Sequence, residues 1–145
     1  MEYQSNTVLI TGASRGLGAN FSKVLAADGF KILGVGRNKK NLETVISNLP
    51  NQNLGHSYIE VDVTNEQEVH EKIGGLDIYG LVNNAGIAST KLLHQETKSN
   101  LSKIFETNLL GSINVSNAII PTMIKNKNGK IINLSLIHIS EPTRR

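Results

Sequence analysis

The 145-residue sequence contains no cysteine, no tryptophan and few aromatic residues, which make up 4% of the chain. The absence of cysteine excludes a disulfide framework, a thiolate metal site and a thiol nucleophile. No apolar run approaches the roughly 18 residues that a membrane-spanning helix requires. The first residues, Met1 to Gln4, have neither a secretory nor a transit pattern. We therefore expect no membrane partner and a cytoplasmic protein, with the mitochondrion as the alternative for a longer parent protein.

Charge is modest, since the net charge is +3 and 39% of the residues are hydrophobic. These values are typical of a single globular domain with its own core. The basic residues are scattered apart from two short clusters, which have no interleaved aromatic residues, so we expect no nucleic-acid partner. The histidines share no metal-ligand spacing and predict no metal site; they are His56, His70, His94 and His138.

The stretch from Thr11 to Gly18, Thr-Gly-Ala-Ser-Arg-Gly-Leu-Gly, is the most informative feature of the sequence. It follows an apolar run over residues 7–10 and precedes a helical pattern over residues 17–27. In this context glycines let the backbone approach a pyrophosphate, and the helix N-terminus offers free N–H groups to it. A structural turn can also need glycine for positive φ, but three glycines within one turn favour a dinucleotide site. The predicted contacts are Gly12, Ser14, Arg15, Gly16, Leu17 and Gly18.

The rest of the chain alternates between strand and helix patterns. Further strands are predicted over residues 31–36, 56–61, 79–82 and 129–133, and helices over residues 42–49, 65–73 and 100–125. This alternation predicts an α/β fold, a doubly wound parallel sheet of the Rossmann type that stops after about its fifth strand. The apolar stripe of the last helix consists of Leu101, Ile104, Phe105, Leu109, Ile113 and Val115.

The residue that comes after the second strand selects the cofactor in dinucleotide folds. An acidic side chain there binds the ribose 2′-hydroxyl of NAD, whereas an arginine accommodates the 2′-phosphate of NADP. Arg37 occupies this position, no acidic residue lies between positions 34 and 40, and Arg15 can point at the same phosphate. A guanidinium group stays charged and matches a phosphate in a bidentate way. We therefore predict NADP(H) as the cofactor, against the alternative that Arg37 is an exposed loop arginine.

Four motifs in this order resemble the classical short-chain dehydrogenase/reductase family. They are the glycine turn, Asp62-Val63, Asn83-Asn84-Ala85-Gly86 and Thr107-Asn108. The Gly-x-x-x-Gly-x-Gly spacing is that family's own variant, and the resemblance covers roughly residues 7–133. Within the family the sequence is most similar to NADPH-dependent 3-oxoacyl-[acyl-carrier-protein] reductases, through Thr-Gly-Ala-Ser-Arg-Gly and the Glu-Thr-Asn-Leu of residues 106–109.

The resemblance assigns a role to each matching residue. Asp62 would accept a hydrogen bond from the adenine amine, with the Val63 backbone beside it. Asn84, Ala85 and Gly86 would line the cofactor ribose and stabilise the central strand. Asn108 would be the catalytic residue that holds a water molecule in the proton relay. Each residue also has a structural alternative: a turn or capping role for Asp62 and the asparagine pair, and a satisfied polar side chain within a helix for Asn108.

The family's remaining catalytic residues have no counterpart in this sequence. Its members carry a serine after the fifth strand and a Tyr-x-x-x-Lys pair, in which tyrosine is the general acid, lysine lowers its pKa and serine polarises the substrate. None of the tyrosines here has a lysine four positions on; they are Tyr3, Tyr58 and Tyr79. The position of the serine holds Leu136, and Ser135 lies one residue early. We therefore expect the chain to be inactive by itself.

Residues 134–145 resemble a translated sequencing adapter and not the family. We expect a dinucleotide-binding half-domain over residues 1–133, then a non-native tail, with the natural protein continuing beyond Asn133. The expected function of that protein is NADPH-dependent reduction of a carbonyl, of the 3-oxoacyl-thioester kind, by a homodimer or homotetramer. The alternatives are a non-catalytic dinucleotide-binding protein and an extended-branch epimerase or dehydratase. The Gly-x-x-Gly-x-x-Gly turn of that branch does not fit the glycines of this chain.

Overall fold

The computed structural model describes residues 5–134, in which strands and helices alternate. The strands are β1 (Thr7–Thr11), β2 (Lys31–Gly36), β3 (Ser57–Glu60), β4 (Gly80–Asn83) and β5 (Lys130–Asn133). The helices are α1 (Gly16–Ala27), α2 (Lys39–Ser47), α3 (Glu66–Ile73), α4 (Lys98–Phe105) and α5 (Gly111–Asn126). Short 3₁₀ turns lie at Gln52–Leu54 and Leu93–Gln95. Within the described residues, no helix is long and apolar enough to cross a membrane.

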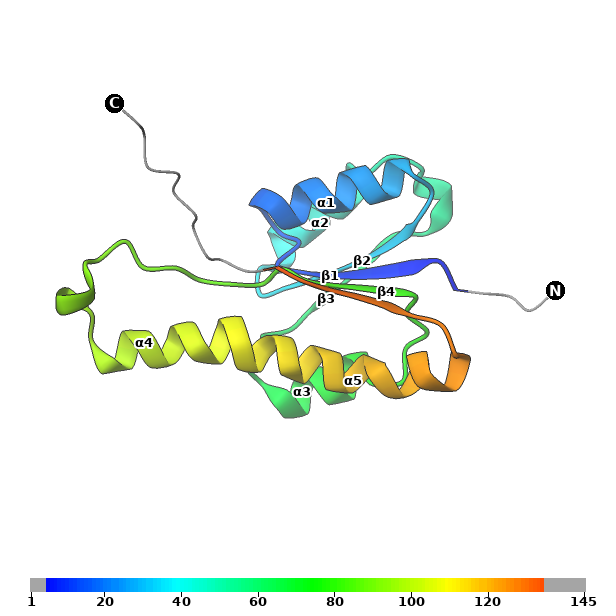
Figure 1. Cartoon of the computed structure of the whole chain (residues 1–145). Helices are drawn as coiled ribbons and strands as arrows, with labels where there is room; N and C mark the ends of the chain where they lie inside the picture. Colours follow the sequence, from blue (N-terminus) through cyan, green and yellow to red (C-terminus); the bar gives the residue numbers. More distant parts are fainter. Residues whose placement is uncertain (1–4, 135–145) are drawn as a thin grey trace, which may run out of the picture.

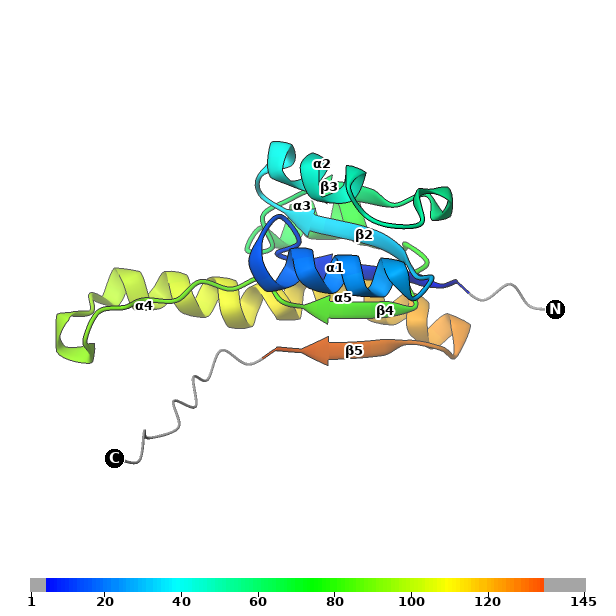
Figure 2. The same ribbon diagram turned by 90° about the horizontal axis from the view of Figure 1, so that it is seen from above.

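The strands form one parallel sheet in the order β3-β2-β1-β4-β5. Helices α1 and α2 cover one face of the sheet, and α3 and α5 cover the other (Figure 1). Viewed from above, β1 lies in the middle and β5 at the edge (Figure 2). The predicted doubly wound parallel sheet with five strands is thus confirmed. The tail predicted to be non-native lies outside the described residues, apart from Leu134.

Two apolar clusters fill the space between the sheet and its helices. On β1, Val8 and Ile10 point into the cluster under α1 and α2, whereas Leu9 points into the cluster above α3 and α5. Successive side chains of a strand face opposite sides, so a strand covered on both faces must be apolar at every position. This requirement explains why β1 is a continuous apolar run in the sequence.

Side-chain caps fix the start of three helices. Asn38, Asn65 and Thr97 each accept a hydrogen bond from the backbone N–H three residues further on, at the first turns of α2, α3 and α4. The helix predicted over residues 65–73 starts at this asparagine, a residue type preferred at helix N-caps. Helix α1 differs, because its N-cap residue Arg15 makes no side-chain capping bond.

The long helix predicted over residues 100–125 is instead built from three joined segments. Between α4 and α5, the segment Glu106–Leu110 is π-helical (η3), and the N–H of Gly111 donates to the carbonyl of Glu106 across it. The extra residue shifts the faces of the helix. The predicted stripe is not continuously buried: Val115 is in the core, but Phe105 is 63%, Leu109 52% and Ile113 43% exposed.

Candidate functional site

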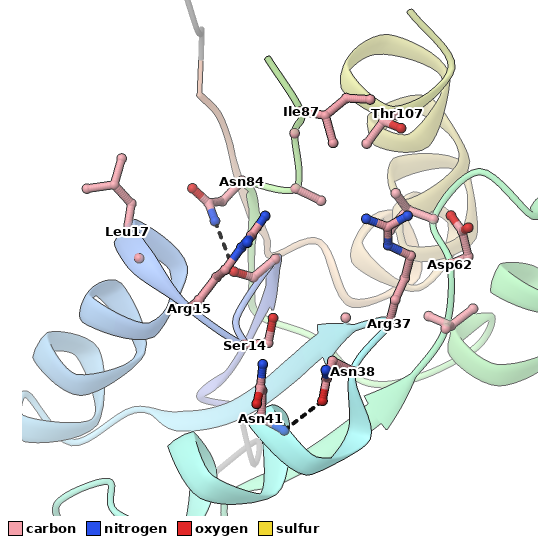
Figure 3. A pocket seen from close by; sticks show the side chains of 17 residues that line it. Ser14, Arg15, Leu17, Arg37, Asn38, Asn41, Asp62, Asn84, Ile87 and Thr107 are labelled. Carbon is pink, nitrogen blue, oxygen red and sulfur yellow. Dashed lines mark hydrogen bonds between the residues drawn. The ribbon is translucent and has the colours of Figure 1, made fainter. Parts of the chain in front are cut away.

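The site lies at the carboxyl ends of the strands, where the direction of the chain crossovers reverses. β1 is bounded by β2 on one side and by β4 on the other, and open α/β sheets bind ligands at such a switch point. A cavity of about 640 Å³ opens there. Its walls come from the segments that follow β1, β2, β3 and β4 and from η3 (Figure 3).

The glycine turn forms one wall of this cavity. Gly12 and Gly16 adopt φ values of +65° and +55°, in the left-handed region that favours glycine. Gly18 serves a different purpose, because a Cβ added there would lie 2.1 Å from the Gly12 carbonyl oxygen and 2.6 Å from Asn84 Nδ2. Gly12 and Gly16 therefore shape the loop at the cavity, whereas Gly18 lets the first turn of α1 pack against the Gly12 carbonyl and the Asn84 side chain. Gly18 does not line the cavity itself.

Thr11 joins the turn to the segment after β4. Its buried hydroxyl oxygen accepts hydrogen bonds from the backbone N–H groups of Asn84 and Ala85, both at 2.9 Å. The Asn84 side chain makes two hydrogen bonds in the other direction, because its Nδ2 donates to the carbonyls of Thr11 (3.1 Å) and Gly12 (3.3 Å). Asn84, Ala85 and Gly86 all line the cavity, and the Asn84 bonds hold β4 against the central strand.

Two guanidinium groups enter the cavity from different elements. Arg15 comes from the turn before α1 and Arg37 from the end of β2, and Figure 3 shows both side chains directed into the same open space. Within residues 5–134 the one ion pair joins Lys72 and Glu68, so neither arginine is paired with an acidic side chain. Ser14 and Leu17 line the same wall as Arg15.

Asp62 and Val63 line the cavity beyond β3. Asp62 Oδ1 accepts hydrogen bonds from the N–H of Thr64 (3.0 Å) and from its hydroxyl (2.8 Å), which is the turn role considered as an alternative. The carbonyl of Val63 accepts a bond from Asn114 Nδ2 at 2.9 Å. The turn fixes the Asp62 carboxylate at the cavity and still leaves it further acceptor capacity.

Asn108 lies beside the cavity and not on its lining. Its Oδ1 accepts from the Ile87 N–H at 2.7 Å, and its Nδ2 donates to the Ile87 carbonyl at 2.8 Å. The residue sits in the π-helical segment, a distortion frequent at functional sites. Asn108 thereby fixes the position of Ile87, which lines the cavity together with Thr107.

Six lining residues were missed by the sequence prediction: Gly36, Asn38, Asn41, Val61, Ile87 and Thr107. Most of them adjoin predicted residues, so the signal was their position after a strand. Asn41 and Thr107 are the exceptions, because they lie within α2 and η3 and reach the cavity only through the paths of these helical segments.

Comparisons with known proteins agree with this geometry. The family model described as short chain dehydrogenase matches residues 6–142. A 3-oxoacyl-[acyl-carrier-protein] reductase from Vibrio cholerae is 32% identical over 144 residues, which cover 94% of this chain and 57% of that protein. A serine 3-dehydrogenase from Rhizobium radiobacter is 34% identical over 144 residues, covering 95% and 56%.

Solved structures show the same relationship. A short-chain dehydrogenase from Sphingobium yanoikuyae in complex with NADPH superposes with a TM-score of 0.77 at 27% identity, covering 86% of this chain and 51% of that one. The chain thus spans little more than half the length of these relatives. The family match, the sequence identity to these relatives and the shared fold agree: this chain belongs to the short chain dehydrogenase family.

Proposed function

We propose that the full-length protein is an NADPH-dependent oxidoreductase that reduces a carbonyl to an alcohol, and that residues 1–133 supply its cofactor site. The observation that carries this proposal is that Arg15 and Arg37 share one cavity at the switch point of the sheet and have no acidic partner within residues 5–134. Two such cations favour an anionic ligand. The 2′-phosphate of NADPH is such a group, and NADH lacks it.

The start of α1 fits the pyrophosphate of a dinucleotide. Among helices α1 to α4, α1 is the one whose first turn has no side-chain cap, and that turn faces the cavity. Its free N–H groups, with the glycines beside them, form a cradle for phosphate oxygens. A side chain on Gly12 would narrow it, since a Cβ there would lie 3.0 Å from the Ala85 Cα.

Different residues of this chain would bind different parts of NADPH. Arg15 and Arg37 would hold the 2′-phosphate, Asp62 would accept a bond from the adenine amine, and the Asn84–Gly86 segment would line the ribose. When bound, NADPH supplies a hydride to the substrate carbonyl. Asn108 would hold a water molecule of the proton relay, and its bonds to Ile87 keep the wall of the cavity in place at that point.

The resemblance to 3-oxoacyl-[acyl-carrier-protein] reductases supports a 3-oxoacyl-thioester-like substrate for the full-length protein. A non-catalytic dinucleotide-binding role is the second candidate, because no tyrosine of the sequence has a lysine four positions on. The two functions differ in the residues that the natural gene encodes after Asn133. A native reading frame with Tyr-x-x-x-Lys in that region would establish the reductase, and its absence would leave binding alone.

We also propose that the full-length protein is a homodimer or homotetramer. The solvent side of the long helix carries an uncharged face made of Phe105, Leu109, Ile113, Asn117, Pro121 and Ile124. Phe105 and Ile124 are 63% and 70% exposed, and apolar side chains that gather on one exposed face are typical of interaction surfaces. A face without charge can pair with its own copy about a two-fold axis without repulsion between like charges.

Binding of the two cofactors to the purified chain tests the cofactor assignment. We expect NADPH, titrated by its fluorescence, to bind more tightly than NADH. Arg37→Asp should weaken NADPH binding by about 10- to 100-fold and leave NADH binding unchanged or improved, because charge-assisted hydrogen bonds contribute roughly 1.5–3 kcal/mol. Lys40→Asp makes the same charge change on α2 outside the cavity lining and is the matched control. Equal affinity of the unmodified chain for both cofactors would overturn the proposal.

A further inference from the structure

Asn38 has two polar ends, and only one of them is used within the described part of the chain. Its Oδ1 accepts a hydrogen bond from the backbone N–H of Asn41 at 2.9 Å and so caps α2. This bond also settles the orientation of the amide, because a backbone N–H can only be met by the oxygen. The amide nitrogen Nδ2 must therefore point away from the helix.

The free end of the Asn38 amide faces the cavity. Asn38 lines the cavity next to Arg37, and Figure 3 shows its nitrogen on the side away from the capping bond, toward the open space. Among residues 5–134, the capping bond is the one hydrogen bond of this side chain. Two N–H donors are thus held at the rim of the cavity that contains both arginines.

We propose that Asn38 is a specificity-determining residue whose capping bond aims Nδ2–H at the 2′-phosphate of the cofactor. The inference rests on the proposed NADPH function and adds a neutral donor to the two guanidinium groups. Serine or aspartate would cap the helix equally well. Serine would offer no amide donor to the cavity, and aspartate would turn a carboxylate oxygen toward the phosphate.

The capping bond and the phosphate contact share one rigid amide, so each should stabilise the other. A bound phosphate oxygen restrains Nδ2 and thereby keeps Oδ1 on the N–H of Asn41. We therefore expect NADPH to slow hydrogen exchange at the Asn41 amide more than NADH does, at equal saturation. The corresponding cap of α3, in which Asn65 accepts from the N–H of Glu68 at 3.1 Å, lies outside the cavity and should show no such difference.

The experiment compares Asn38→Ser and Asn38→Asp with the matched control Asn65→Ser. We expect Asn38→Ser to weaken NADPH binding by about 5- to 10-fold, as for loss of an exposed hydrogen bond to a charged group, with NADH binding unchanged. Asn38→Asp should weaken NADPH binding by more than about tenfold, since it adds repulsion. Asn65→Ser should leave both affinities unchanged, and all three variants should retain the thermal midpoint within a few degrees.

The outcomes separate this inference from the function on which it rests. If the unmodified chain binds both cofactors equally, the NADPH proposal fails and the inference fails with it. If NADPH is preferred and Arg37→Asp removes the preference, but Asn38→Ser binds NADPH as well as the unmodified chain, the inference alone is overturned. Equal loss of both cofactors in Asn38→Ser would mean that Asn38 only caps the helix, and would likewise overturn it.

Discussion

The side chain of Asn108 and the backbone of Ile87 form a closed pair of hydrogen bonds, 2.7 Å and 2.8 Å long, across 21 residues of sequence. The pair joins the π-helical segment to the loop after β4. Both partners would otherwise present unpaired polar groups at a half-buried position, which is costly. The wall of the cavity at Ile87 is therefore held by a residue that does not itself line the cavity.

Replacing Asn108 by aspartate should keep the bond from the Ile87 N–H and remove the bond to the Ile87 carbonyl. The remaining oxygen can still accept from the Ile87 N–H, but the second oxygen then faces the Ile87 carbonyl. We expect the free energy of unfolding to fall by about 1–3 kcal/mol and the Ile87 amide to exchange faster. Chemical denaturation and hydrogen exchange measure both effects. Asn117→Asp makes the same change on the exposed side of the same helix and should cost less than about 0.5 kcal/mol; equal costs would refute the explanation.

The hydrogen bonds of the Thr11 hydroxyl should contribute to both stability and cofactor binding. Thr11→Val keeps the shape of the side chain but leaves the N–H groups of Asn84 and Ala85 without their acceptor. We expect a loss of about 2–4 kcal/mol in unfolding free energy, together with weaker NADPH binding, because each stranded donor costs roughly 1–3 kcal/mol. Thr11→Ser retains the hydroxyl and should lose far less. A valine variant as stable as the serine variant would show that the two bonds contribute nothing.

The part of the fold that depends on local pattern could be predicted from the sequence. Each of these features depends on a few neighbouring residues: the apolar runs of β1 and β2, the start of α3 at residue 65, and the glycine turn. The interruption of the long helix has no such local signal: it coincides with the bonds between Asn108 and Ile87, which are distant in sequence. A regular helical period over residues 100–125 therefore predicted a straight helix and placed Phe105 and Leu109 on one face with Val115.

The same distinction applies to the site. Arg37 could be located from its position after the second strand, and Asp62 from the resemblance to the family. The contribution of Asn41 depends on where α2 passes, and Thr11 is recognisable only once its hydroxyl is seen between two segments. Gly18 was expected to contact the cofactor, yet the structure gives it a packing role, since a Cβ there would strike the Gly12 carbonyl.

A methyl group at Gly18 should consequently disturb the turn itself. In Gly18→Ala the new Cβ would lie 2.1 Å from the Gly12 oxygen, so backbone must move. We expect overpacking to cost about 1–3 kcal/mol or more and NADPH affinity to fall with it. Gly36→Ala is the control, because its Cβ would meet Leu42 at an ordinary 3.5 Å. Thermal unfolding of both variants measures the difference, and similar midpoints would contradict a packing role for Gly18.

The carboxyl group of Glu96, in the loop before α4, should make the stability of the chain depend on pH. The neighbouring side chains of Ser89 and Asn100 hold the pKa of the Glu96 carboxyl below its ordinary value, and Asn100 Nδ2 donates a hydrogen bond to Glu96 Oε2. The folded state therefore favours the charged form, so the contribution to stability is present above the unfolded pKa and is lost as pH falls through the folded pKa. The unmodified chain should be more stable than Glu96→Gln at pH 7, and this advantage should shrink below about pH 4.5. A constant difference from pH 7 to pH 3 would exclude the effect.

The central place of β1 in the sheet also sets the order in which the chain can be assembled during synthesis. Val8 pairs with Ile32 on one side but with Gly80 on the other, 72 residues further along the chain. At roughly 5–20 residues per second, the ribosome delivers the second partner about 2–10 s after the first. During that interval one edge of the most apolar strand has no neighbour, and such edges invite pairing with other chains. The strand that positions the glycine turn therefore has one unpaired edge until β4 has been synthesised.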